Sequence, residues 1–241
     1  MNTILVAGSG FSTSGPDWVR RHGTGHRLPP HELLPGRWLR RHRDAGAEAV
    51  LAVHCVGSLQ LGLEPGRLVV PDDVLDLTGL PYAESGGPLL HVAFDVPFCP
   101  RLRQALLEAA RGWPRGCVDG GVYAETRGPR LESRAEIRFL AGHADVVGMT
   151  AAREASAARE LGLCYASLCV VANHATGVAR GEAPATARDI VARMEAWAPE
   201  VTRIAEAAVR VVDGNGSAGK CPCADAAGPA DVSAPWSGAK R

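Results

Sequence analysis

Three polar residues stand where apolar, strand-like segments of this 241-residue chain end. Glu132 follows a Gly-Pro turn, Thr150 follows the run Ala-Asp-Val-Val-Gly-Met, and Asn173 follows Cys-Val-Val-Ala. Ligands of open α/β sheets bind at strand ends. A carboxylate, a hydroxyl and a carboxamide brought together there could bind a heterocycle and hold an anion beside it. The sequence therefore predicts a small-molecule site built from these three segments.

A second group of residues could bind the anion itself. The run Gly-Ser-Gly at 8–10 closes the first apolar segment, and the N–H groups of such a turn, with a hydroxyl, can bind phosphate. It is not a dinucleotide fingerprint, because Thr13 occupies the third glycine position. Arg21 and His22 would add positive charge. From these residues alone, a structural turn and a solvated basic loop remain open as alternatives.

The elements that must position these residues follow from the hydrophobic pattern. Strands are expected at 3–7, 48–56, 67–76, 89–95, 117–125, 144–148 and 163–172. Helices are expected at 36–46, 100–111, 133–141, 151–161 and 185–212. This alternation predicts one α/β domain with a central, mixed or largely parallel sheet flanked by helices. Residues 1–213 would form the catalytic domain, and the Gly-, Ser-, Ala- and Pro-rich segment 214–241 is expected to be a disordered tail.

Composition narrows the range of partners. With 26 basic and 26 acidic residues, the chain offers no electrostatic case for nucleic acid or an anionic membrane. No apolar run approaches the roughly 20 residues that span a bilayer, and the N-terminus is typical of a strand rather than a signal peptide, so we expect a cytoplasmic protein. Seven cysteines without framework spacing favour reduced thiols. Cys221-Pro222-Cys223 lacks the CxxC spacing and a second pair, so no metal is predicted.

The polar motifs occur, with others, in an order that resembles the trimeric purine nucleoside phosphorylase and methylthioadenosine phosphorylase family. The motifs are VGSL at 56–59, LEPG at 63–66, VVPD at 69–72, PFCP at 97–100, GPRLESRAE at 128–136, ADVVGMT at 144–150 and the strand ending in Asn173. The resemblance covers roughly residues 20 to 212. It implies the phosphorylase fold, a homotrimer, and phosphorolysis of a purine nucleoside with inorganic phosphate as co-substrate and no metal or organic cofactor.

The resemblance also implies roles for individual residues around the sugar and the phosphate. Phosphate contacts would come from the side chains of Ser9, Arg21, His22 and Thr150 and from the main chain of Cys55. Substrate contacts would come from Met149 under the ribose, from His91 reaching in from a neighbouring subunit, and from Ala175, whose run Asn-His-Ala-Thr-Gly is similar to members acting on methylthioinosine.

The resemblance assigns Glu132 and Asn173 to the nucleobase. A carboxylate accepting from N1–H and an amide bridging O6 and N7 suit a 6-oxopurine, whereas the unprotonated N1 of adenine would face Glu132 acceptor against acceptor. Structural readings stay open for both residues, as a helix-entry carboxylate and a strand-end turn former. Where relatives specific for ordinary nucleosides carry a histidine for the 5′-hydroxyl, this chain has Ala187, which would tolerate a 5′-methylthio or 5′-deoxy sugar.

Two other functions remain open. One is a methylthioadenosine, or 6-aminopurine, phosphorylase of the same family. The other is a degenerate homologue that binds a purine without turnover. The second is motivated by the segment near 11–20, which is markedly shorter here than in full-length relatives, where it carries extra strands of the sheet.

Overall fold

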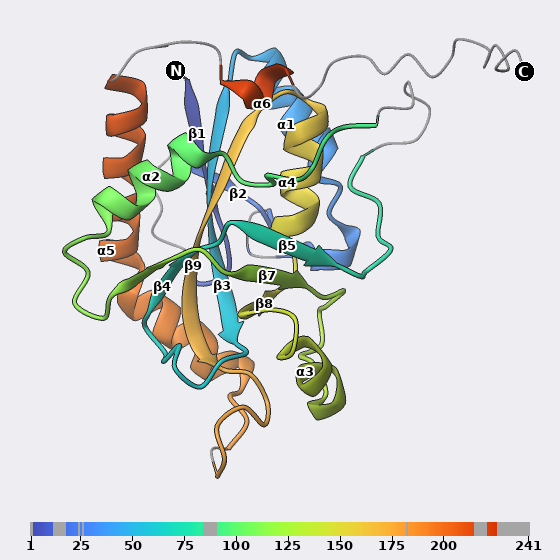
Figure 1. Cartoon of the computed structure of the whole chain (residues 1–241), viewed down its shortest axis with the longest axis vertical. Helices are drawn as coiled ribbons and strands as arrows, with labels where there is room; N and C mark the ends of the chain where they lie inside the picture. Colours follow the sequence, from blue (N-terminus) through green and yellow to red (C-terminus); the bar gives the residue numbers. More distant parts are fainter. Residues whose placement is uncertain are drawn as a thin grey trace, which may run out of the picture.

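The chain folds into a central β-sheet covered by helices on both faces (Figure 1). The computed structural model describes residues 2–11, 18–23, 25, 27–83, 91–181, 183–214 and 221–225. The strands are β1 (Thr3–Ala7), β2 (Trp18–Arg20), β3 (Ala49–Ser58), β4 (Leu68–Val70), β5 (Asp73–Asp76), β6 (Cys117–Asp119), β7 (Val122–Glu125), β8 (Val146–Gly148) and β9 (Cys164–His174). The helices are the 3-10 turn η1 (Pro30–Glu32), α1 (Pro35–Asp44), α2 (Pro100–Ala109), α3 (Arg134–Leu140), α4 (Ala151–Glu160), α5 (Ala187–Gly214) and α6 (Pro222–Asp225).

β3 and β9 form the centre of one mixed sheet. They pair in parallel from Ala49 opposite Cys164 to Ser58 opposite His174, with an irregularity after Val56. β1 pairs in parallel with both β3 and β2, while β8 and β4 pair antiparallel with β3 and β9 respectively. The main path runs β5-β7-β8-β3-β9-β4-β6. β5 and β7 lie at one end of this path, and β4 and β6 lie at the other. Because the chain passes directly from β4 into β5 and from β6 into β7, these two segments connect the ends, and the sheet curls.

The two faces of the central strands bury different helices. Successive residues of a strand point to opposite faces. Leu51 of β3 belongs to the core cluster that holds Met194 of α5, together with side chains of α2. The next residue, Ala52, belongs to the cluster that holds Leu39 of α1, together with side chains of α4. A strand buried on both sides explains why β3 is a nearly continuous apolar run.

Two strands that the sequence predicts as single elements are each divided. The expected strand 67–76 breaks into β4 and β5 at Pro71, which has no N–H to continue a ladder. The expected strand 117–125 breaks into β6 and β7 at Gly120 and Gly121, whose φ angles are 93° and 109°. The Gly121 N–H donates to the Asp72 carboxylate at 2.8 Å, so the two breaks are bonded to each other. Before the two breaks β4 pairs with β9, and after them β7 pairs with β8, so the breaks carry these two segments from one side of the sheet to the other.

Other segments differ from the expectation. Residues 91–95 form no strand, although one was expected at 89–95, and residues 84–90 lie outside the described part of the chain. Of the tail expected to be disordered over 214–241, Gly214 ends α5 and Pro222–Asp225 form α6, while residues 215–220 and 226–241 lie outside the described residues. Cys221 and Cys223 are buried in the core cluster that also holds Met194 of α5. β2 was not expected at all, and residues 12–17 of the shortened segment lie outside the described residues.

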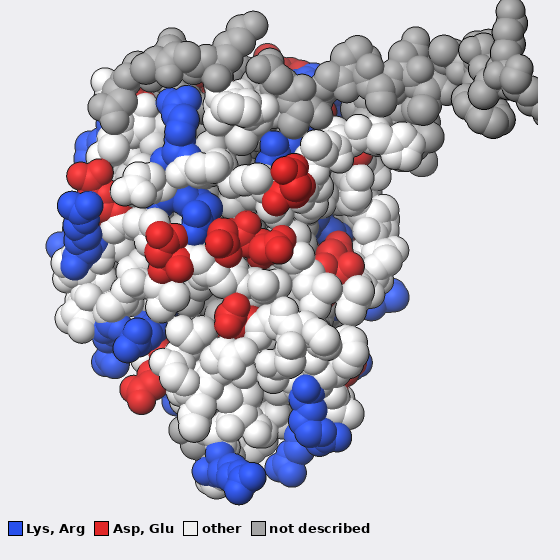
Figure 2. Space-filling model, in the orientation of Figure 1, with Lys and Arg blue, Asp and Glu red and all other residues white. Residues whose placement is uncertain are grey.

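Charges of both signs share the visible surface. Figure 2 shows acidic side chains gathered across the middle of one face and basic ones around its edge, with neither sign continuous over it. No helix among the described residues is long and apolar enough to cross a membrane.

Candidate active site

A cavity of about 470 Å³ opens where β1, β2, β8 and β9 end. Its lining includes Ser9, Arg21, His22, Cys55, Glu132, Met149, Thr150, Asn173 and Ala175. Residues from distant parts of the sequence, which the motifs predicted to act together, therefore line one space. His91 is exposed and lies outside this cavity, so its expected role across a subunit interface stays a prediction.

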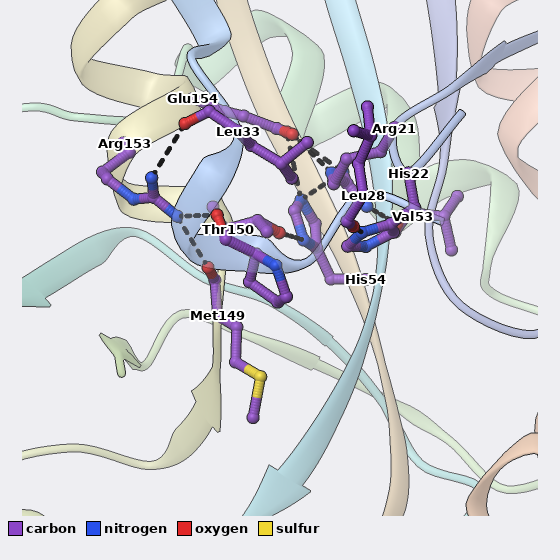
Figure 3. A network of polar contacts seen from close by, with 12 residues as sticks. Arg21, His22, Leu28, Leu33, Val53, His54, Met149, Thr150, Arg153 and Glu154 are labelled. Carbon is purple, nitrogen blue, oxygen red and sulfur yellow. Dashed lines mark hydrogen bonds and ion pairs between the residues drawn. The ribbon is translucent and has the colours of Figure 1, made fainter. Parts of the chain in front are cut away.

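The positive charge at the inner end of the cavity belongs to a buried ion pair. The Arg21 guanidinium binds both carboxylate oxygens of Glu154, with Nη2 donating to Oε2 at 3.0 Å, and both side chains are 1% exposed (Figure 3). Nη1 donates to the Val53 carbonyl at 3.2 Å, and Nη2 contacts His54 Nε2 at 3.1 Å. Burial opposes the charge, but Glu154 outweighs it, and the pKa of Arg21 is raised. Four of the five guanidinium hydrogens are thus engaged, and one on Nη1 remains for an anion.

Gly8 makes this placement of the guanidinium possible. A Cβ at position 8 would lie 2.8 Å from Arg21 Nη1 and 2.8 Å from the Val53 carbonyl oxygen, closer than side chains pack. Without a side chain there, the turn that carries Ser9 lies directly against the guanidinium. The Gly-Ser-Gly turn and the arginine therefore form one corner of the cavity, where an anion was expected to bind.

His54 links Arg21 to Thr150, and the network assigns its tautomer (Figure 3). Nε2 of His54 lies 3.1 Å from Arg21 Nη2 and 3.0 Å from the Tyr165 hydroxyl, which donates to Glu154. Because Arg21 can only donate, we assign Nε2 as the acceptor, which places the proton on Nδ1. Nδ1–H then donates to Thr150 Oγ1 at 3.2 Å, so the hydroxyl proton of Thr150 is directed elsewhere. Burial, followed by the charges of Arg21 and His22, lowers the pKa of His54 well below its ordinary value. A neutral His54 thus orients the Thr150 hydroxyl as a donor toward the cavity.

Two further cavity residues have defined protonation. His22 Nδ1 lies 2.8 Å from the Leu28 carbonyl, so Nδ1 carries a proton and donates it. Burial, then the neighbouring Cys169, raises the pKa of Cys55 to about 12. The Cys55 thiol therefore stays protonated and is no nucleophile, which agrees with a main-chain role for this residue.

Arg153 fixes the segment that covers the cavity. Its guanidinium donates to the carbonyls of Pro30 at 2.8 Å, Leu33 at 3.1 Å and Met149 at 3.2 Å (Figure 3). It also pairs with the buried carboxylate of Glu125, which accepts N–H bonds from the first turn of α4. One side chain thus ties the 30–33 segment to the end of β8.

Glu132 and Asn173, the two residues expected to bind the base, are held by their neighbours. Glu132 is half-buried, and its Oε1 accepts from the Thr126 hydroxyl at 2.6 Å, which leaves Oε2 for a ligand. Asn173 Nδ2 donates to the His174 carbonyl at 2.7 Å. That bond identifies the amide nitrogen, whose second hydrogen can bind a ligand. The cavity therefore presents an acceptor and a donor as well as the corner formed by Ser9 and Arg21.

Sequence reasoning missed several lining residues. Arg27 comes from a segment to which no motif was assigned, Leu131 stands next to Glu132 in the GPRLESRAE motif but was given no role, and the start of α5 adds Ile190 and Val191 beside Ala187. The helical period places residues 187, 190 and 191 on one side of the expected helix 185–212. The sequence therefore indicated this apolar side, but it did not show that the side lines the cavity.

The buried, neutral His54 makes a pH prediction. The unfolded chain takes up a proton on this residue below about pH 6.5, whereas the folded chain resists it, so the free energy of unfolding falls as pH drops. The limiting slope for this one proton is about 1.4 kcal/mol per pH unit. Urea unfolding of wild type and His54→Gln between pH 8 and 5.5 should show a shallower slope for the variant. The exposed His143→Gln should keep the wild-type profile, and equal slopes for wild type and His54→Gln would contradict the assignment.

Comparisons with known proteins agree with the geometry. A family model described as the Phosphorylase superfamily matches residues 22–210. The "Probable 6-oxopurine nucleoside phosphorylase" of Thermococcus kodakarensis is 37% identical over 219 residues, which cover 87% of this chain and 80% of that protein. The "Probable S-methyl-5'-thioinosine phosphorylase" of Methanopyrus kandleri is 36% identical over 89% of this chain and 83% of its own. A solved methylthioadenosine phosphorylase from Schistosoma mansoni, in complex with adenine, matches with a TM-score of 0.83 at 26% identity, covering 94% of this chain and 97% of the other.

The chain therefore belongs to the phosphorylase superfamily. Its fold and its relatives are of the purine nucleoside phosphorylase type, which makes it an enzyme of the pentosyltransferase class. The family and the mixed α/β fold expected from the sequence are both confirmed.

Proposed function

We propose that this enzyme phosphorolyses a 6-oxopurine nucleoside whose sugar carries a 5′-methylthio or other 5′-deoxy group. A phosphate oxygen forms a bond to C1′ while the bond from C1′ to N9 breaks, and the bonding electrons leave with the purine. The products are the free base and a ribose 1-phosphate derivative. The observation that carries the proposal is one cavity lined by Glu132, Asn173, Arg21 and Thr150.

Phosphate is proposed to bind in the corner formed by Ser9, Arg21, His22 and Thr150, with the main chain of Cys55. The remaining Nη1 hydrogen of Arg21 and the oriented hydroxyl of Thr150 are donors suited to an anion. The reaction would use inorganic phosphate as co-substrate and no metal or organic cofactor. Met149, which also lines the cavity, would lie beneath the sugar.

The base is proposed to bind between Glu132 and Asn173. As the glycosidic bond breaks, negative charge accumulates on the purine, and a preorganised donor at N7 lowers the energy of that state. The second Nδ2 hydrogen of Asn173 can supply this bond. Oε2 of Glu132 would accept from N1–H, which only the 6-oxopurine carries.

The sugar substituent is proposed from the start of α5. Ala187, Ile190 and Val191 line the cavity, and we propose that they face the 5′ position of the sugar. A hydroxyl buried against apolar side chains would lose its hydrogen bonds with water, whereas a methylthio group would gain apolar contact. Ala175 adds a further small apolar surface.

A second candidate is phosphorolysis of methylthioadenosine. A relative from Pyrococcus furiosus named "S-methyl-5'-thioadenosine phosphorylase" is 33% identical over 86% of this chain. With methylthioadenosine as substrate, Glu132 would have to turn away from the base or be protonated. We therefore place this reaction second.

Assembly and location are also proposals. His91 is exposed on this chain, and a homotrimer would let it contribute to a neighbouring subunit's cavity. We further propose that the protein is cytoplasmic, because its nucleoside and phosphate substrates are small soluble molecules.

The direct test is base release measured by chromatography. The enzyme is incubated with inosine, guanosine, methylthioinosine and methylthioadenosine, with and without phosphate. We expect phosphate-dependent hypoxanthine release to be fastest from methylthioinosine and adenine release to be slower. Faster adenine release would select the second candidate. If no base is released from any of the four, the proposal fails, and hypoxanthine binding without phosphate binding by calorimetry would identify a non-catalytic homologue.

A further inference from the structure

Four buried cysteines converge at the end of the molecule opposite the cavity. Cys99 precedes α2, Cys164 begins β9, and Cys221 and Cys223 belong to the C-terminal segment that contains α6. Their four sulfur atoms all lie within 4.8 Å of one another, and Cys99 Sγ lies 3.6 Å from Cys221 Sγ. All four are free thiols rather than disulfides.

The spacing of the sulfurs suits one tetrahedral metal ion. Zinc–sulfur bonds of about 2.3 Å in a tetrahedron place the sulfurs about 3.8 Å apart. The Cys99–Cys221 separation is close to this value, and the 4.8 Å limit holds for every pair. Cysteines that pack merely as small apolar residues would have no reason to direct four sulfurs at one point. The remaining cysteines, Cys55, Cys117 and Cys169, take no part in the cluster.

The C-terminal segment needs an anchor that its sequence does not otherwise provide. α6 has four residues, far fewer than a helix requires to be stable by itself. Yet Cys221 and Cys223 are buried in the same core cluster as Leu102 of α2 and Met194 of α5. Metal binding by cysteines can supply the free energy that orders such a short segment.

We propose that Cys99, Cys164, Cys221 and Cys223 bind one Zn²⁺ as a tetrathiolate centre that anchors the C-terminal segment to the domain. Each thiol gives up its proton as its sulfur coordinates the ion, so binding releases four protons. Four protein ligands leave no open position, which is typical of structural rather than catalytic zinc. Cys164 and Asn173 lie at opposite ends of β9, about 30 Å apart at the usual rise per residue, so the ion takes no part in phosphorolysis.

The sequence could not reveal this centre. The tail pair has one residue between its cysteines, and its partners stand far upstream at 99 and 164. Spacing along the chain identifies a metal site only when the ligands come in local pairs. Here two of the four ligands are brought in by separate elements.

The test is the metal content of the full-length protein, prepared without chelator and under reducing conditions. We expect about one Zn²⁺ per chain by plasma mass spectrometry, and intense visible absorption from tetrahedral Co²⁺ when cobalt replaces zinc. Cys221→Ser and Cys223→Ser lie outside the central sheet and should fold, but they should lose most of the bound metal. Cys117→Ser, in the half-buried β6, is the matched control and should retain it.

Removal of the ion should lower the melting temperature of the wild type and change that of Cys223→Ser little. Phosphorolysis rates at low temperature serve as a separate readout and should be unaffected, so failure of the proposed activity would leave this test intact. Two results would overturn the proposal. One is a folded, reduced protein that binds neither Zn²⁺ nor Co²⁺. The other is non-reduced peptide mapping that finds these four residues paired in disulfides.

Discussion

Asn173→Ala is expected to lower kcat/KM for the 6-oxopurine nucleoside by about 10²–10³-fold, the usual loss when one preorganised donor to a developing anion is removed. The His174 carbonyl fixes the Asn173 amide with its nitrogen as donor, so the second hydrogen is oriented before substrate binds. Most of the loss should fall on kcat, because the charge at N7 develops only in the transition state. Steady-state kinetics with methylthioinosine and inosine measure it.

Glu132→Gln provides the matched test of base selectivity. Glutamine can present its carbonyl to N1–H or its amide to an unprotonated N1, so the ratio of 6-oxopurine to 6-aminopurine activity should fall about tenfold or more. Thr126→Val removes the hydroxyl that donates to Oε1 of Glu132 and should weaken 6-oxopurine binding less than Glu132→Gln does. Wild-type rates for Asn173→Ala, or an unchanged base preference for Glu132→Gln, would remove these residues from the base site.

Glu154→Gln is expected to destabilise the protein by about 3–5 kcal/mol, because it leaves the buried Arg21 guanidinium without its counter-charge. At this chain length such a loss lowers the melting temperature by about 6–20 °C. The same change should raise the KM for phosphate, since Glu154 holds the guanidinium against the Gly8 turn. Differential scanning fluorimetry and phosphate-dependent kinetics measure the two effects.

The control for this prediction replaces both residues of the ion pair. Replacing both members of a buried pair by apolar residues can restore stability, so Arg21→Met with Glu154→Leu should be more stable than either single variant while still failing to use phosphate. Asp44→Asn, which breaks an ion pair with Arg43 that is 39% and 59% exposed, should melt close to the wild type. If Glu154→Gln has the same melting temperature as the Asp44→Asn control, the charge of Glu154 does not contribute to stability and the prediction is wrong.

Much of the fold was predictable because its signals are local. A helix was expected at 133–141, and α3 begins directly after Ser133, which forms both bonds of a capping box with Glu136. The apolar runs predicted β3 and β9, which are buried on both faces. Features that depend on which strands pair were predicted less well. The division at Pro71 was missed because one continuous apolar strand and two strands that pair at opposite ends of the sheet look alike in sequence.

The site divides in the same way. Strand ends with recognisable flanks predicted that Glu132, Thr150 and Asn173 lie together, and all three line one cavity. The partners that set their chemistry were invisible in the sequence. Glu154 lies on a helix and His54 on a strand, and the apolar runs of both elements predict only core positions. Both residues acquire their roles by contacting Arg21.

The sequence by itself therefore determined the class of fold, the family and the residue types offered to a purine and to phosphate, because strand and helix periods and contiguous motifs are properties of neighbouring residues. Only the tertiary structure decided which charges are neutralised, which nitrogen of His54 holds the proton, and that four distant cysteines meet. Those outcomes depend on contacts between side chains far apart in the chain, such as Arg21 and Glu154, which are 133 residues apart, and Cys99 and Cys221, which are 122 apart, and separation along the chain does not encode them.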